Sequence, residues 1–78
     1  MQLNQLRHII NPPAGMQRPE FNIEFVKKST GEIVNGLCVC VNTSFKTDTI
    51  KIKFIASEQI RTIHALSILS YNNEEINP

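Results

Sequence analysis

Two cysteines and two histidines are the side chains of this sequence whose types could support metal binding or nucleophilic catalysis. Cys38 and Cys40 stand two residues apart in an apolar run, and the histidines are His8 and His64. On an extended strand, residues i and i+2 point to the same face about 6.5 Å apart, which is near the upper limit for a disulfide. We therefore expect two reduced thiols that pack as small apolar side chains.

Neither metal binding nor catalysis gains further support from the spacing of these residues. A structural zinc site needs about four ligands, and neither histidine is spaced from the cysteines as in a zinc motif. A cysteine nucleophile would need His64 as its base together with an oxyanion motif, but no glycine-rich elbow is present. No glycine-rich phosphate loop or suitable carboxylate pair is present either. We predict no catalytic, metal-binding or cofactor-binding residues and no enzyme.

Any attraction for nucleic acid must come from a local group of basic side chains, because the chain has almost no net charge. Its 78 residues include 8 Lys and Arg against 7 Asp and Glu, a net charge of +1. Basic side chains beside an exposed aromatic ring are typical of small barrels that bind single strands or RNA. The alternative is a solvated face, because lysines on outer strands also discourage edge pairing. The candidate nucleic-acid-binding residues are Lys27, Lys28, Phe45, Lys46, Lys51, Lys53 and His64.

Residues 49–54 carry the clearest secondary-structure pattern in the chain. Apolar side chains at positions 50, 52 and 54 alternate with polar ones at 49, 51 and 53. A half-buried strand requires this alternation, and a helix cannot use it. If Ser57 and Glu58 form a two-residue turn, the next strand places Thr62 opposite Lys53 and His64 opposite Lys51.

The other strands are separated by residues that favour turns. We expect a first strand that begins at Phe21 and closes before a loop with Gly31, where positive φ is tolerated. Gly36 predicts a bulge or bend within the second strand, and Asn72 and Asn73 predict a type I′ turn. The second, third, fourth and fifth predicted strands cover residues 32–41, 49–56, 60–71 and 74–76.

The fourth predicted strand is apolar on both faces, so it must be central, strongly bent or covered. Five consecutive antiparallel strands, two of them long and bent, predict an all-β fold. In strand order and length the pattern resembles an SH3-like barrel or a related curved meander sheet, a resemblance that names no function. We assign residues 21–78 to one small β-barrel domain and residues 1–20 to an N-terminal extension with a Pro-rich linker.

The N-terminal extension has the spacing of a short amphipathic helix. Leu3, Leu6, Ile9 and Ile10 follow helical periodicity, and the proline-rich residues 11–19 end the helix and act as a linker. A helix this short is marginal by itself. It either docks over an open end of the sheet, frays, or binds a partner.

These features favour a small non-enzymatic binding or adaptor module that contacts a protein through a sheet edge or the N-terminal arm. Edge pairing would also give a homodimer. The alternative is a nucleic-acid-binding accessory protein that uses the basic strand face. No small-molecule ligand is evident, and no apolar run is long enough for a signal or a membrane span. We therefore expect a cytoplasmic protein.

Overall fold

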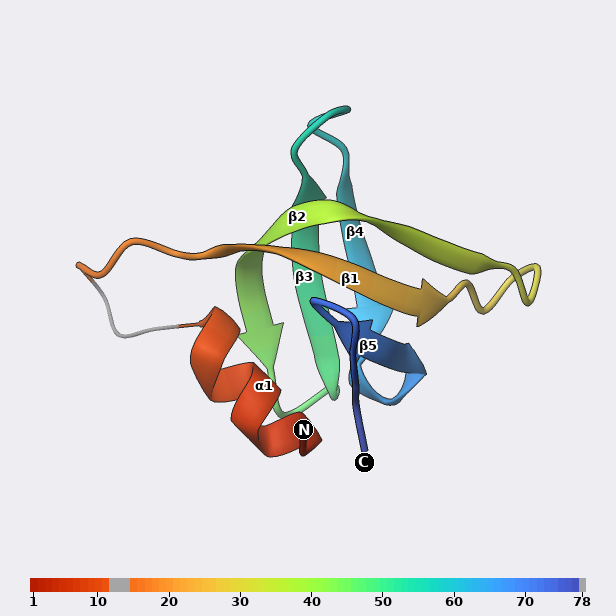
Figure 1. The fold of residues 1–78 in the computed structure, drawn as a ribbon, viewed down its shortest axis with the longest axis horizontal. Helices are drawn as coiled ribbons and strands as arrows, with labels where there is room; N and C mark the ends of the chain where they lie inside the picture. The colour runs from red at the N-terminus through yellow and green to blue at the C-terminus, as the bar shows by residue number, and fades with distance from the viewer. Residues whose placement is uncertain (12–14, 78) are drawn as a thin grey trace.

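A computed structural model describes residues 1–11 and 15–77 as a short helix packed against a curved antiparallel sheet (Figure 1). The sheet has six strands in the order β4-β3-β2-β1-β5-β6. The predicted all-β class is confirmed, but the predicted count of five strands is wrong. The elements are α1 (Leu3–Ile10), β1 (Glu20–Val26), β2 (Ile33–Ser44), β3 (Thr49–Phe54), β4 (Ile60–His64), the 3-10 turn η1 (Ala65–Ser67), β5 (Ile68–Tyr71) and β6 (Glu74–Glu75).

The extra strand arises because the predicted fourth strand is interrupted by η1. The Ser67 hydroxyl donates a hydrogen bond of 2.6 Å to the carbonyl oxygen of His64, which closes this turn. Ala65 and Ile68 are buried on either side of Leu66, which is 67% exposed. The apolar pattern on both faces therefore reflects a break in the strand, after which the chain returns beside β1 as β5.

The hairpin between β3 and β4 is shifted by two residues from the predicted register. Its loop spans residues 55–58, and the Phe54 N–H donates to the Gln59 carbonyl at 2.9 Å. Because a shift of two residues preserves the side-chain alternation, the buried and exposed faces remain as predicted. The observed partners are Thr62 for Lys51, Ile60 for Lys53 and His64 for Thr49.

Two predicted turns are confirmed by their backbone angles, and of the bulge or bend predicted at Gly36 the bulge is not found. Gly31 has φ +75°, and Asn72 and Asn73 have φ +48° and +68°. Pairing between β1 and β2 runs through Gly36 without interruption. The register of β2 with β3 instead shifts between positions 40 and 42. Gly36 has a different role, because a Cβ atom there would lie 3.0 Å from the Phe54 ring.

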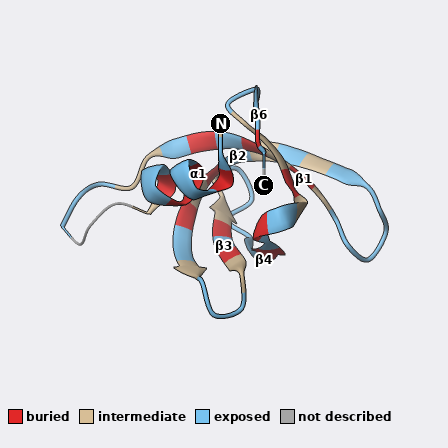
Figure 2. Ribbon diagram, turned by 90° about the horizontal axis from the view of Figure 1, so that it is seen from below, coloured by how far each residue is buried: buried red, intermediate tan, exposed pale blue. Residues whose placement is uncertain are grey.

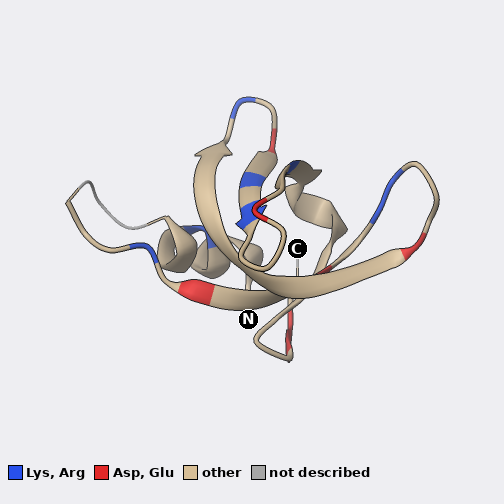
Figure 3. Ribbon diagram, turned by 90° about the horizontal axis from the view of Figure 1, so that it is seen from above, with Lys and Arg blue, Asp and Glu red and all other residues tan. Residues whose placement is uncertain are grey.

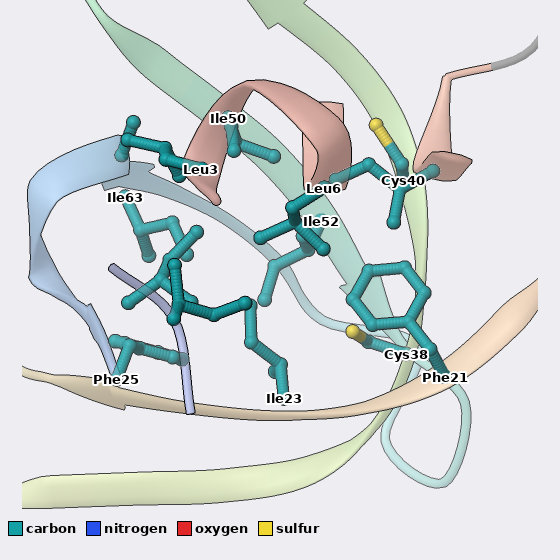
Figure 4. Packing of buried hydrophobic residues seen from close by; sticks show 14 residues of the cluster. Leu3, Leu6, Phe21, Ile23, Phe25, Cys38, Cys40, Ile50, Ile52 and Ile63 are labelled. Atoms are coloured by element: carbon teal, nitrogen blue, oxygen red, sulfur yellow. The ribbon is translucent and has the colours of Figure 1, made fainter. Parts of the chain in front are cut away.

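The hydrophobic core lies between the sheet and α1. Leu6 and Ile10 of the helix are fully buried, and Figure 4 shows Leu6 among Cys40, Ile52 and other core side chains. Buried and exposed positions alternate along the central strands (Figure 2). The core residues are Leu3, Leu6, Ile10, Phe21, Ile23, Phe25, Cys38, Cys40, Ile50, Ile52, Ile63, Ala65, Ile68 and Ile76.

The helix therefore docks on the sheet. The guanidinium of Arg7 forms an ion pair with Asp48, and the Asn11 amide donates to the Thr43 hydroxyl at 3.2 Å. Part of the predicted Pro-rich linker, at positions 12–14, lies outside the described residues. No helix in the described ranges is both long enough and apolar enough to cross a membrane.

Candidate functional site

One end of the sheet is covered by the chain's own N-terminus. Gln2 and Asn77 form a parallel bridge. The Leu3 N–H donates to the Asn77 carbonyl at 2.8 Å, and the Asn77 N–H donates to the Met1 carbonyl at 2.9 Å. The N-terminal amine also donates to the Glu75 carbonyl at 2.9 Å. The end that carries β6 is thus closed by neighbouring backbone.

The opposite end of the sheet is the open edge of β4. Alternate residues of an antiparallel strand direct their N–H and C=O groups toward the partner strand. The backbone hydrogen bonds from Phe54 to Gln59 and from Ala65 to Asp48 show which residues of β4 direct their backbone groups toward β3. They leave the backbone groups of Ile60, Thr62 and His64 directed away from β3. Among the described residues β4 pairs only with β3, so we call these three positions the β4 edge.

A pocket of about 310 Å³ lies beside the β4 edge, and we call it the basic pocket. Its apolar lining comes from Phe25, Val26, Val34, Phe54 and Ile63. The rings of Phe25 and Phe54 are stacked with their centroids 6.5 Å apart. The end of β1 and the start of β2 form one wall, and β4 forms the other. The full lining is Phe25, Val26, Lys27, Lys28, Val34, Phe54, Gln59, Arg61, Thr62, Ile63, His64 and Ser67.

Basic side chains surround this pocket, and none of the described residues that line it is acidic. Lys27 and Lys28 come from the loop after β1, whereas Arg61 and His64 come from β4. The Lys28 Nζ and His64 Nε2 atoms lie 3.5 Å apart. Arg61 donates to the Gln59 side chain at 3.1 Å. The pocket therefore combines an apolar interior with a cationic rim, which suits a ligand that is partly apolar and negatively charged.

Three of the sequence-predicted residues meet at this pocket, namely Lys27, Lys28 and His64. Arg61 and Phe54 were not predicted as site residues. The available signal was the position of Arg61, which shares the core-facing side of β4 with Ile63 and is thus a charge in an apolar pattern. That signal marks an unusual residue, but it does not reveal that the end of β1 lies across from it.

The other predicted residues do not line this pocket, and Figure 3 shows that the Lys and Arg residues are spread over several elements. Lys51 lines a shallow polar hollow with Thr62, while Lys53 lines another hollow that also contains Glu20. Lys46 and Phe45 belong to the loop between β2 and β3. The Phe45 side chain is 67% exposed, but the Arg7 guanidinium carbon lies 4.7 Å from its ring centroid. Lys51 and Lys53 project from the outer face of β3 opposite Thr62 and Ile60 of β4, but neither lines the pocket.

The cysteines are free, buried and directed into the core. Burial raises the pKa of the Cys38 thiol to about 12, and the neighbouring Cys40 adds to this shift. Burial also raises the pKa of Cys40, while the guanidinium of Arg18 opposes that shift. Such thiols are poor nucleophiles because the thiolate is the reactive form. Within the part of the chain that the structure describes, no group of three or more His, Cys, Asp and Glu residues could hold a metal ion.

Comparison of the chain with protein-family models, with curated proteins and with solved structures gives no match. The geometry of the β4 edge and the basic pocket is therefore the basis for assigning a function.

Proposed function

We propose that this chain is a small non-enzymatic binding module whose β4 edge pairs with an extended segment of a partner protein. The observation that carries the proposal is the contrast between the two ends of the sheet. The β6 end is covered by the N-terminus, whereas Ile60 and Thr62 direct N–H and C=O groups outward. In strand addition these groups bind the partner backbone, and nearby pockets select its side chains.

The edge is favoured over the N-terminal arm as the contact surface. The apolar face of α1 is formed by Leu3, Leu6 and Ile10, which are all buried against the sheet. Of its large apolar side chains, Ile9 remains 42% exposed. A helix that binds a partner needs a free apolar face, and this face is used within the protein's own core.

A partner of different sequence is favoured over a homodimer. In a two-fold dimer through β4, the same residues of both copies meet. That arrangement gathers Lys28 and Arg61 of both copies into one interface, and an interface that collects like charges is unfavourable. A partner with negative charge avoids this repulsion.

We also propose that the curved sheet is an SH3-like barrel. The support is the antiparallel meander from β1 to β4 and the return of β5 beside β1. The cytoplasm is the proposed location, and the two free, buried thiols are consistent with a reducing compartment.

Nucleic-acid binding is the second candidate function, and the cluster of Lys27, Lys28, Arg61 and His64 is the observation in its favour. Recognition of single strands commonly needs an exposed ring on which bases stack. Phe25 is only 5% exposed, and the Phe45 ring has the Arg7 guanidinium over it. Phe45 does not line the basic pocket, so the cationic cluster has no fully exposed ring beside it.

Selection of displayed random peptides against the full chain tests the proposed function. We expect the selected peptides to bind the wild type and the variant Thr62→Val but not Thr62→Pro. Proline removes the outward N–H of Thr62 and leaves the ladder with β3 intact. Valine retains the N–H and is the matched control. Equal binding to Thr62→Pro, or the absence of selectable peptides, contradicts the proposal; binding of a single-stranded oligonucleotide that weakens with salt supports the second candidate.

A further inference from the structure

We propose that the basic pocket is the specificity pocket of the β4 edge, and that it selects an acidic extended peptide with one apolar anchor side chain. The anchor enters the pocket between Phe25 and Ile63, and flanking carboxylates pair with the cationic rim. This inference rests on the proposed function and names the chemical class of the partner.

The position of the pocket relative to the edge supports this assignment. Thr62 and His64 belong to the β4 edge and also line the basic pocket. A strand added to β4 would lie about 4.8 Å from it, and therefore along the mouth of the pocket. Every second side chain of that strand would point to the same side of the sheet as Arg61 and Ile63. Backbone pairing thus delivers a side chain to the pocket.

The pocket interior is suited to an apolar anchor. Phe25 and Ile63 are 5% and 7% exposed and belong to the core. Val34 and Phe54 are partly buried and pack against that core. An apolar side chain placed among them would remove more apolar surface from water, which is the main favourable contribution to such binding. The volume of about 310 Å³ accommodates one aromatic or branched side chain.

The rim determines the charge of the partner. Lys27, Lys28, Arg61 and His64 are contributed from two sides of the pocket, and no Asp or Glu lines it. Because Lys28 Nζ and His64 Nε2 are 3.5 Å apart, one carboxylate beside both atoms can accept from the Lys28 ammonium, and also from His64 when the imidazole carries its proton on Nε2. Arg61 can bind a second carboxylate through its planar guanidinium. A cationic or neutral peptide would leave these groups without an anionic partner.

The test uses three displayed peptide libraries that share one variable apolar position and differ in the charge of the flanking residues. The flanks are acidic, neutral or basic, and the target is the full chain at low salt. We expect enrichment from the acidic library, with binding that weakens as salt increases. Replacing the selected apolar residue by alanine should reduce affinity about tenfold, the effect of losing one buried side chain.

The double variant Lys28→Glu, Arg61→Glu should lose binding of the selected acidic peptides by about a hundredfold or more, as expected for reversal of paired charges. Lys46→Glu with Lys51→Glu is the matched control, because it makes the same change of net charge at two exposed lysines that do not line the pocket. Circular dichroism of each variant verifies that the sheet is retained. Equal losses in the control and the double variant overturn the proposal, since they would reflect net charge alone.

The outcomes separate this inference from the proposed function. Enrichment from the neutral or basic library, with binding lost in Thr62→Pro, retains strand addition and rejects the acidic partner. No enrichment from any library rejects both. Acidic peptides that fail to bind, together with a single-stranded oligonucleotide that binds the wild type but not the variant Lys28→Glu, Arg61→Glu, would overturn the inference. That outcome assigns the pocket to nucleic acid.

Discussion

The Arg7 guanidinium carbon lies 4.7 Å from the centroid of the Phe45 ring, and the same group forms an ion pair with Asp48. A buried helix residue is thereby attached to two points of the loop between β2 and β3. Arg7 is 6% exposed, and its Nε has no hydrogen-bond partner. This arrangement places the guanidinium over one face of the exposed Phe45 ring, and it holds α1 against the loop between β2 and β3.

The variant Asp48→Asn should destabilise the protein because it leaves the buried charge of Arg7 without a counterion. The Asp48 side chain is 49% exposed, so we expect a loss of about 1–3 kcal/mol, below that for a fully buried pair. Asparagine tolerates the left-handed backbone of this position, where φ is +56°. Urea unfolding measures the change in free energy.

Arg7→Met is the control for this ion pair. Methionine retains the apolar length of the side chain and removes both the charge and the unpartnered Nε. Replacing a buried ion pair by an apolar group often leaves the free energy of unfolding almost unchanged. The stability of Arg7→Met should therefore remain within about 1 kcal/mol of the wild type. If Asp48→Asn has no effect, the ion pair makes no contribution to stability.

Leu6→Ala should cost far more stability than Ile9→Ala, although both changes are in the same short helix. Leu6 is fully buried, whereas Ile9 is 42% exposed. Loss of a buried leucine costs about 2–5 kcal/mol, and alanine favours helix at both positions. Urea unfolding should place Ile9→Ala within about 1 kcal/mol of the wild type. Similar small losses in both variants would indicate that α1 does not dock in solution.

Local sequence patterns were sufficient for β1, β2 and β3 and for several turns of this fold. Alternation identified β3, and Gly31, Asn72 and Asn73 occupy positions whose positive φ was predicted from residue type. The loop after β3 could not be predicted in the same way. A turn that places His64 opposite Lys51 and a turn that places Thr62 opposite Lys51 bury the same residues. Side-chain alternation therefore cannot distinguish the two turns.

Tertiary contacts account for the part of the candidate site that the sequence did not reveal. Lys28 and His64 were predicted as basic surface residues, but their 3.5 Å approach depends on how β1 ends relative to β4. The break at η1 was missed because apolar residues on both faces are also expected of a central strand. Arg61 was visible only as a charge at a core-facing position, and its role depends on the open edge of β4.

Burial of Cys38 should make the protein less stable at alkaline pH. The folded pKa of about 12 exceeds the ordinary value of 9.0, so the native state retains a proton that the unfolded chain releases. This stabilising contribution is complete below about pH 9 and is lost as the pH rises toward 12. The expected slope is about 1.4 kcal/mol per pH unit for one thiol. Urea unfolding at several alkaline pH values measures it.

Cys38→Ala isolates this contribution, because all other alkaline groups are common to both proteins. The variant should lose stability less steeply with pH than the wild type above pH 9, even if its stability at neutral pH is lower. A thiol reagent should also react slowly with the native wild type and rapidly after unfolding. Parallel stability curves for the two proteins would contradict a raised pKa at Cys38.

Gly36→Ala should affect both stability and the basic pocket through Phe54. The added Cβ would lie 3.0 and 3.1 Å from two atoms of the Phe54 ring, and this ring is stacked with Phe25 in the pocket lining. We expect a loss of about 1 kcal/mol from overpacking, larger than the benefit of a stiffer unfolded chain. In a Phe54→Leu background the same change should cost less, because the ring is absent. Urea unfolding of the two single variants and the double variant gives the coupling energy; additive effects would show that the glycine is not required by this ring.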